Sequence, residues 1–382
     1  MPLAPAGFTE LTCAQSNQFV ESMGEPGYRA KQLRKWVYQN LALSYDEMTD
    51  LPLALRQRLA KETRLHSLEP AQNATGQDGT LKTLFKLADG KTVEAALMYY
   101  GREGGGERRT VCVSTQAGCA IGCPFCATGQ QGIERNLTPG EIIDQVLYFA
   151  RYLREELKEG KSAGDKTGGR VSNIVFMGMG EPLLNYDALW PAIEMLNSPD
   201  GFGLGARNMV ISTAGVVPQI KRLSREKLQV GLAVSLHASD NKLRDRLVPL
   251  NRKYPLEELI QACQEYNIMT GRRLSFEYIL FNGINDSVAQ ARALAALVQG
   301  LKCHINLIPA NFTADPTFRP PPRRVILAFE NELKQGHVNV TLREPRGQDI
   351  NAGCGQLRSR FLRETGQGTG KSLRMEKVNN VS

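Results

Sequence analysis

Three cysteines lie close together in the stretch "GCAIGCPFCATG", which begins at Gly118. Cys119, Cys123 and Cys126 are separated by three residues and then by two. Structural zinc and iron–sulfur clusters usually take four protein ligands, so this set is one ligand short. Zinc would need Cys112 or a histidine as its fourth ligand, and no second half-site is present. An iron–sulfur cluster on three thiolates leaves one iron open to a substrate or cofactor, and we favour that interpretation.

Two further cysteines could act as nucleophiles. Cys112 lies on an expected strand, seven residues before Cys119. Cys354 lies in the glycine-flanked segment "RGQDINAGCGQL", where a thiol is accessible and its thiolate could attack an electrophile. The other cysteines lie in apolar contexts that are typical of inert core thiols: Cys13, Cys263 and Cys303.

Short β-rich runs alternate with helix-length segments from about residue 110 onward. About six strand–helix units predict an α/β fold, a partial TIM-like barrel whose chemistry lies at the carboxyl ends of its strands. One helix is expected to begin after Thr138, with Pro139 in its first turn and Glu141 at the third position. The segments that follow the strands would share one site: the cysteine loop, "GMGEP", "ST", "SLHA" and "PAN".

The chain before the barrel has a helical pattern. The segment "YRAKQLRKWVYQNLA" predicts an amphipathic helix, because four apolar residues fall on one stripe. These residues are Leu33, Trp36, Val37 and Leu41. The other faces carry basic residues that we expect to be solvated: Arg29, Lys31, Arg34 and Lys35.

Three regions follow from these patterns. We expect a small helical, RNA-interacting accessory domain over residues 1–92 and the barrel with its C-terminal cysteine segment over 93–363. Two strands with a turn at "ADGK" are expected between Thr83 and Tyr100. Residues 364–382 have the composition of a disordered tail.

The overall composition narrows the class of partner. Lys and Arg total 47 against 39 Asp and Glu, which suits nucleic acid but is equally compatible with an ordinary basic surface. No apolar run approaches the roughly 18 residues of a membrane span, and the N-terminus lacks the pattern of a secretory signal. We therefore expect a cytoplasmic monomer with no membrane partner and with reduced cysteines.

Cys-x-x-x-Cys-x-x-Cys, with Phe125 just before the last cysteine, resembles the radical S-adenosylmethionine (SAM) signature. "GMGEP" (178–182) resembles the segment of that superfamily that binds the SAM amino group. The resemblance implies a [4Fe–4S] cluster on the three cysteines. The amino and carboxylate groups of SAM would chelate the fourth iron, and reductive cleavage of SAM would give a 5′-deoxyadenosyl radical.

Several segments, which follow one another along the chain, resemble a single family within that superfamily. They are "YRAKQLRKWVY", "CVSTQAGCAIGCPFCATGQQG", "FMGMGEPLLN", "ISTAGVVP", "SLHA" and "DINAGCGQL", and they resemble the RlmN-type methyltransferases over about Tyr28–Leu357. That family methylates C2 of one adenine in the peptidyl-transferase region of 23S rRNA, and of the adenine just 3′ of some tRNA anticodons. The substrates implied here are therefore 23S rRNA and tRNA, with an electron donor such as flavodoxin or ferredoxin.

The resemblance also implies residue roles. Cys354 would take a methyl group from one SAM, a second SAM would generate the radical that removes a hydrogen from it, and the carbon radical would add to adenine C2. Cys112 would then form a disulfide with Cys354 and free the base, with Glu94 as proton acceptor. The implied SAM contacts are Gly180, Glu181, Ser212, Ser235, Leu236, His237 and Asn311.

Two departures from the family pattern and two alternatives stay open. The loop "GREGGGERR" between Glu94 and Cys112 is longer than expected, and Asn351 stands where the family usually has an acid. A related Cfr-type enzyme would methylate C8 of the same rRNA adenine, although Pro182 in "GMGEPL" favours the C2 enzyme. The second alternative is a zinc-containing RNA-binding protein without catalytic activity.

Overall fold

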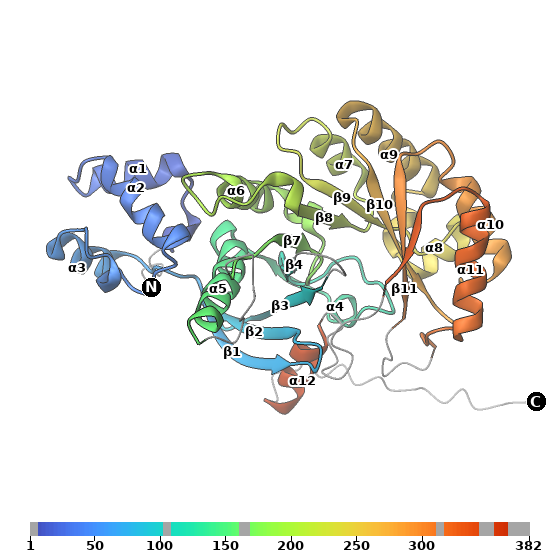
Figure 1. Ribbon diagram of the computed structural model, residues 1–382, viewed down its shortest axis with the longest axis horizontal. Coiled ribbons are helices and arrows are strands. Elements are labelled where there is room, and N and C mark those ends of the chain that lie inside the picture. The colour runs from blue at the N-terminus through green and yellow to red at the C-terminus, as the bar shows by residue number, and fades with distance from the viewer. Residues whose placement is uncertain (1–6, 102–107, 160–168, 311–316, 344–354, 366–382) are drawn as a thin grey trace, which may run out of the picture.

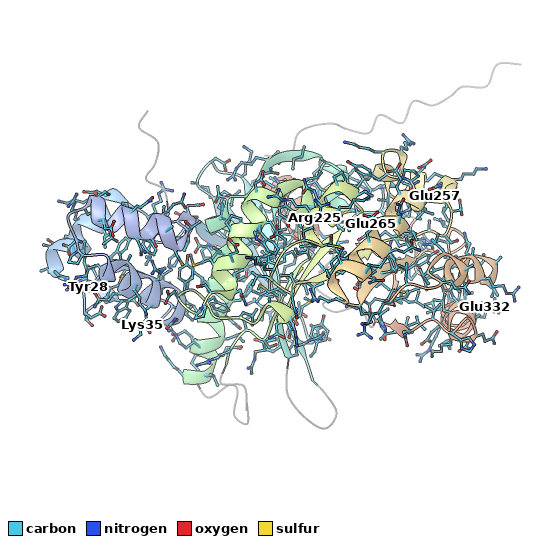
Figure 2. The ribbon with its side chains drawn as sticks, turned by 90° about the horizontal axis from the view of Figure 1, so that it is seen from above. Tyr28, Lys35, Arg225, Glu257, Glu265 and Glu332 are labelled. Atoms are coloured by element: carbon cyan, nitrogen blue, oxygen red, sulfur yellow. The ribbon has the colours of Figure 1, made fainter. Side chains whose placement is uncertain are left out.

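The computed structural model describes residues 7–101, 108–159, 169–310, 317–343 and 355–365. A small helical module lies at one end of the molecule, and a large twisted sheet with its covering helices makes up the rest (Figure 1). Tyr28 and Lys35 of the helical module lie at the opposite end of the molecule from Glu257 and Glu332 (Figure 2).

The helical module contains α1 (Cys13–Ser22), α2 (Tyr28–Arg34), which continues as a π-helical turn over Lys35–Gln39, and α3 (Leu53–Glu62). The predicted apolar stripe is confirmed, because Leu33 and Val37 are fully buried. The expectation that every basic residue here is solvated is wrong for Arg34. Its guanidinium is buried and donates to the Ser16 hydroxyl at 2.6 Å, because α1 packs directly against this face of α2.

One ten-stranded sheet runs in the order β1-β2-β3-β4-β7-β8-β9-β10-β11-β12. The strands from β4 to β12 are parallel and follow one another in chain order, as in an open, partial barrel. The parallel strands are β4 (Arg108–Cys112), β7 (Asn173–Phe176), β8 (Met209–Thr213), β9 (Gly231–Ser235), β10 (Leu274–Leu280), β11 (Cys303–Pro309) and β12 (Val340–Leu342).

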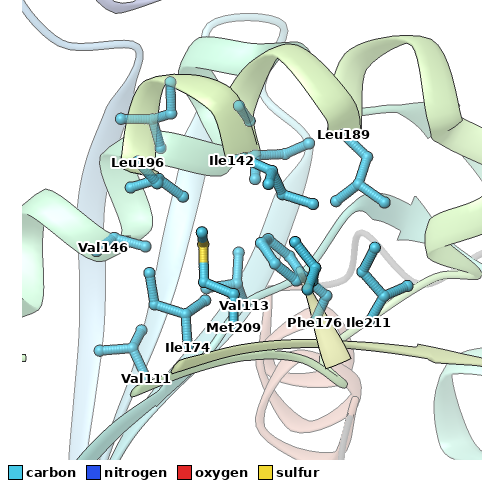
Figure 3. Packing of buried hydrophobic residues seen from close by; sticks show 14 of the residues in the cluster. Val111, Val113, Ile142, Val146, Ile174, Phe176, Leu189, Leu196, Met209 and Ile211 are labelled. Atoms are coloured by element: carbon cyan, nitrogen blue, oxygen red, sulfur yellow. The ribbon is translucent and has the colours of Figure 1, made fainter. Parts of the chain in front are cut away.

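Helices cover the outer face of these strands, and the core lies between the two layers (Figure 1). Val111, Ile174 and Phe176 of the sheet pack against Ile142 and Leu196 of the helices (Figure 3). The expected capping box at Thr138 and Glu141 is confirmed at the start of α5. The helices are α5 (Pro139–Lys158), α6 (Tyr186–Asn197), α7 (Val217–Leu223), α8 (Asn241–Leu247), α9 (Leu256–Thr270), α10 (Val288–Leu297) and α11 (Arg323–Gln335).

An antiparallel extension precedes the barrel strands. It consists of β1 (Leu68–Thr75), β2 (Leu81–Leu87) and β3 (Thr92–Tyr100), so the expected strands between Thr83 and Tyr100 are confirmed. The helical pattern ends at α3, and the division at residue 92 stays a prediction. A short helix, α12 (Gln356–Glu364), packs on β3 at the far end of the chain.

A two-stranded hairpin, β5 (Gln116–Gly118) and β6 (Ile133–Asn136), leaves the end of β4 and carries the cysteine loop with the short helix α4 (Ala127–Gln130). Among the described residues, none of the helices combines the length and the apolar character that a membrane span requires.

Candidate active site at the carboxyl ends of the strands

The cysteine loop is closed by tight backbone contacts. The Cys119 N–H donates to the Gly132 carbonyl at 2.8 Å, and the Cys126 N–H donates to the Cys123 carbonyl at 3.1 Å. Gly118 has a φ of 81°, and a Cβ atom there would lie 2.0 Å from the Gly132 oxygen. Only glycine allows this approach, so the hairpin brings the three cysteines into one compact loop.

Burial in this loop disfavours the charged thiolate form of its cysteines unless a cation is bound to them. Burial raises the pKa of Cys119 to about 12, and burial together with the neighbouring thiols holds the pKa of Cys123 well above its usual range. Thiolates here therefore need iron or another cation to compensate their charge. A donor set of three soft thiols fits an iron–sulfur cluster, in which each thiolate binds a different iron. Within the described residues, no group of three His, Cys, Asp or Glu side chains is arranged to hold a single metal ion.

Phe125 connects this loop to the barrel mouth. Its ring lies edge-on to His237, with centroids 5.3 Å apart, and 5.1 Å from Phe281. The Phe318 ring completes the cluster, with its centroid 6.1 Å from that of Phe125. Aromatic pairs at these separations and angles are favourable beyond their buried area. The aromatic residue between the second and third cysteines therefore fixes the loop against the ends of β9 and β10.

The "GMGEP" loop after β7 lies directly on the segment that follows β4. The Met179 N–H donates to the Ser114 hydroxyl at 2.8 Å, and the Glu181 N–H donates to the Gln116 side-chain oxygen at 2.8 Å. Gly180 has a φ of 99°, and a Cβ atom there would lie 2.5 Å from the Gln116 Cβ. The close approach of Gly180 to Gln116 explains the second glycine of "GMGEP". The same contacts place the loop beside the cysteine hairpin.

The Glu181 carboxylate is buried and bound by the protein itself. It accepts the Ala214 N–H at 2.6 Å and the Leu183 N–H at 3.1 Å, and it bonds to the Thr213 side chain. Burial outweighs these hydrogen bonds and raises the pKa of Glu181 to about 7. The carboxylate joins the end of β8 to the "GMGEP" loop, and its expected contact with SAM stays a prediction.

His237 lies at the end of β9 with a φ of 60°, an uncommon value for a residue other than glycine. Its Nδ1 accepts the Ile279 N–H at 3.1 Å, and its carbonyl accepts the Asn285 amide at 2.8 Å. Burial, with a smaller effect of Arg244, lowers the pKa of His237 to about 3, so the ring is neutral at physiological pH. Two hydrogen bonds hold this backbone conformation at the barrel mouth.

Sequence reasoning missed Arg244, which lies fully buried on α8. Its guanidinium donates to the carbonyls of Ala214 at 2.7 Å, Ser235 at 3.0 Å and Leu236 at 3.1 Å. Burial lowers the pKa of Arg244 to about 10, which still leaves a cation at neutral pH. Its neighbour Leu243 is apolar, but no local pattern marks the arginine itself as buried, because its carbonyl acceptors lie outside this short helix.

Cys112 and Glu94 lie on neighbouring strands. Cys112 is paired with Ala96 of β3 on one side and Val175 of β7 on the other, and burial raises the pKa of Cys112 to about 11. Glu94 is not an exposed strand residue: its side chain is 2% exposed, and its carboxylate lies 2.7 Å from the Lys82 ammonium. Its role as proton acceptor stays a prediction. The charges of Lys82 and Glu94 both act on the Cys112 thiol.

The structure brings most of the expected residues to one end of the sheet. Ser212 and Ser235 are half-buried at the ends of β8 and β9, and Leu236 is fully buried. Cys354, Asn311 and Asn351 lie outside the described residues. The carboxyl ends of four parallel strands and the cysteine hairpin therefore form a single candidate site.

Comparisons with known proteins define the class of this fold and site. Residues 113–295 match the radical SAM superfamily, and residues 8–65 match the ribosomal RNA large subunit methyltransferase N-terminal domain of RlmN. A crystal structure of a radical SAM methyltransferase from Sphaerobacter thermophilus superposes with a TM-score of 0.86 at 46% identity, covering 92% of this chain and 99% of that one. The chain is a radical SAM protein with the expected α/β fold, and this class implies a [4Fe–4S] cluster and SAM.

Curated relatives narrow the class. A probable dual-specificity RNA methyltransferase RlmN from Desulfitobacterium hafniense is 45% identical over 349 residues, covering 91% of this chain and 95% of the relative. One from Geobacillus kaustophilus is 43% identical, covering 93% of each chain. The chain belongs to the RlmN family of radical SAM RNA methyltransferases. The alternative of a non-catalytic zinc protein is therefore wrong.

Proposed function

We propose that this protein methylates C2 of an adenine in 23S rRNA and in tRNA. The observation that carries the proposal is its 45% identity, over almost the whole chain, to a relative named as a dual-specificity RNA methyltransferase. The same family supports a ping-pong mechanism through S-methyl-Cys354 with two SAM per turnover.

The target atom explains why radical chemistry is needed. Adenine C2 has no lone pair and a C–H bond that is not acidic, so it cannot attack SAM as a ring nitrogen can. Cys119, Cys123 and Cys126 would hold the cluster, which supplies the electron for cleavage of SAM and hence for hydrogen-atom removal. The residues proposed to bind SAM are Gly180, Glu181, Ser212, Ser235, Leu236, His237 and Asn311.

The chain's own residues would carry the methyl group and release the product. Cys354 accepts a methyl group from SAM by polar displacement, and S-adenosylhomocysteine leaves. After this methyl group loses one hydrogen atom, its carbon joins adenine C2. The adduct would give up one electron, which the oxidised cluster held by the three cysteines could take up, and the C2 proton would leave to Glu94. Cys112 then attacks the Cys354 sulfur, so that an S–S bond replaces the S–C bond and the freed carbon takes up a proton as the new methyl group. A pKa of about 11 keeps the Cys112 thiol protonated at neutral pH, so its proton must be removed in this step.

Nucleoside analysis of rRNA and tRNA tests the proposal. A strain without this gene should lack C2-methyladenosine in both RNAs, and expression of the wild-type chain should restore it. C8-methyladenosine in the rRNA would instead assign the Cfr-type activity. The Cys123→Ala variant, which loses a cluster ligand, is the negative control.

The release step has its own test. A Cys112→Ala variant should accumulate a covalent protein–RNA adduct, because Cys354 cannot be freed by disulfide formation. Clean turnover by this variant would contradict the role of Cys112. We further propose that the protein is a cytoplasmic monomer reduced by flavodoxin or ferredoxin, and that residues 1–92 form the RNA-interacting unit.

A further inference from the structure

The N-terminus of α12 is capped by a carboxylate from a distant strand. The Gly355 N–H donates to Glu94 Oε2 at 2.8 Å, and the Arg358 N–H donates to Glu94 Oε1. No side chain of α12 itself caps this end. Glu94 therefore satisfies two of the free N–H groups and places negative charge at the positive end of the helix dipole.

The Arg358 side chain forms a second attachment of this helix turn. It is 1% exposed and donates to the Thr92 hydroxyl at 3.0 Å, to the Gln131 side-chain oxygen and to the Glu134 carboxylate. Three separate elements thus supply acceptors to one rigid guanidinium, an arrangement that a flexible ammonium group cannot reproduce.

Gln131 links this attachment to the cysteine loop. It follows α4 directly, five residues after Cys126. While its oxygen accepts from Arg358, its Nε2 donates to the Ser359 hydroxyl at 2.6 Å. Gln131, at the end of α4, therefore binds the side chains of both Arg358 and Ser359.

Helices α12 and α4 also contact each other closely. Gly355 has a φ of 80°, and a Cβ atom there would lie 2.4 Å from the Thr128 hydroxyl and 2.8 Å from the Thr128 N atom. Thr128 lies on α4, two residues after Cys126. The start of α12 thus has one defined position relative to the cysteine loop.

We propose that Arg358 is a positioning residue that docks α12 on the cysteine hairpin and thereby controls how readily Cys354, which directly precedes Gly355 in the sequence, is methylated. This inference rests on the proposed role of Cys354 as the methyl carrier. Glu94, which is paired with Lys82, accepts N–H groups at the same helix end. Removing one partner of a buried charged group is strongly destabilising, which suits a side chain that holds one arrangement.

The experiment compares Arg358→Ala and Arg358→Lys with Arg360→Ala, a matched control that removes an exposed arginine from the same helix. Anaerobically reconstituted protein is measured for iron and sulfide content, amide hydrogen exchange over residues 356–364, and S-methylation of Cys354 after incubation with SAM. With RNA added, the ratio of 5′-deoxyadenosine to methylated adenine is also measured.

Loss of these buried charged hydrogen bonds should raise exchange in α12 at least about tenfold and lower the rate of Cys354 methylation about tenfold in Arg358→Ala. More 5′-deoxyadenosine should form per methylated adenine, because the methyl group is no longer well placed. Iron and sulfide content should match the wild type, Arg360→Ala should behave as wild type, and Arg358→Lys should recover only part of the loss.

Wild-type exchange and methylation in Arg358→Ala would overturn the inference. So would a loss of iron in proportion to activity, because that would assign Arg358 a general structural role. If Arg358→Ala does not fold, Arg358→Lys decides the question with the same measurements. If Cys354 carries no methyl group even in the wild type, the proposed function fails, whereas the exchange data still decide whether Arg358 holds α12.

Discussion

Two buried glutamates show how differently the two sides of this site are built. Glu181 at the barrel mouth is 3% exposed and Glu94 beside α12 is 2% exposed. Among the described residues, the partners of Glu181 are N–H and hydroxyl groups, and burial raises the pKa of this carboxyl to about 7. Glu94 has an ammonium group at 2.7 Å in addition to two backbone N–H groups.

The difference teaches how each region holds its parts together. The mouth is fixed through backbone groups of consecutive strand ends, to which Glu181, His237 and Arg244 all bind. The α12 side is fixed through charged side chains from segments far apart in the chain: Lys82, Glu94 and Arg358. We therefore expect damage at the mouth to destabilise the barrel, and loss of the Arg358 contacts to release one helix.

The largest effect is expected from Arg244→Ala. It leaves the carbonyls of Ala214, Ser235 and Leu236 without their donor, and should lower the free energy of unfolding by about 4 kcal/mol. Chemical denaturation measures this loss. Arg246→Ala, an exposed neighbour on the same helix, should change stability by less than about 0.5 kcal/mol. Equal effects of the two substitutions would contradict the proposal that Arg244 stabilises the barrel mouth.

The next effect is expected from Lys82→Met. It leaves Glu94 as a buried carboxylate without its cation and should cost about 3 kcal/mol of unfolding free energy. Adding Glu94→Gln should restore part of this loss, because the uncompensated charge is then gone. A double-mutant cycle measures the coupling, and simple additivity would show that the two side chains do not act as a pair.

Glu181→Gln should alter the pH dependence of stability. The pKa of Glu181 is raised from 4.5 to about 7 in the folded state, so the fold favours the protonated form. Its contribution is therefore fully present below pH 4.5 and is lost as pH rises toward 7. The wild type minus variant difference in unfolding free energy should fall by about 3 kcal/mol over this window. SAM-free protein is used, and a difference that does not vary with pH would contradict the buried, uncompensated state of this carboxyl.

The smallest effect is expected from Gly355→Ala. Strain at a φ of 80° and the contact with Thr128 should together cost about 2 kcal/mol, seen mainly as faster hydrogen exchange in α12. Gly271→Ala has a similar φ of 65° but no atom within 4 Å of the added Cβ, so it should show the strain alone, about 1 kcal/mol. If both changes cost the same, the contact between α12 and α4 is not tight.

Much of the site could be predicted from local patterns. The spacing of Cys119, Cys123 and Cys126 lies within one short loop, and the capping box at Thr138 is complete within four residues. The strand–helix alternation likewise led to the parallel sheet, because each buried strand is a short apolar run. These features depend on neighbours in the chain, which a sequence shows directly.

The amino-acid sequence by itself thus determined the cluster motif, the order of the strands and the family. Only the tertiary structure decided the roles of the buried charges. Arg34 lies in a helix whose basic residues are expected to be solvated, and no sequence pattern singled out Arg244 or Arg358, yet all three are buried. Their partners lie on other elements: Ser16 for Arg34, Ala214 for Arg244, and Thr92, Gln131 and Glu134 for Arg358. A buried charge is stable only where such partners converge, and that convergence depends on packing between distant segments, which no local pattern records.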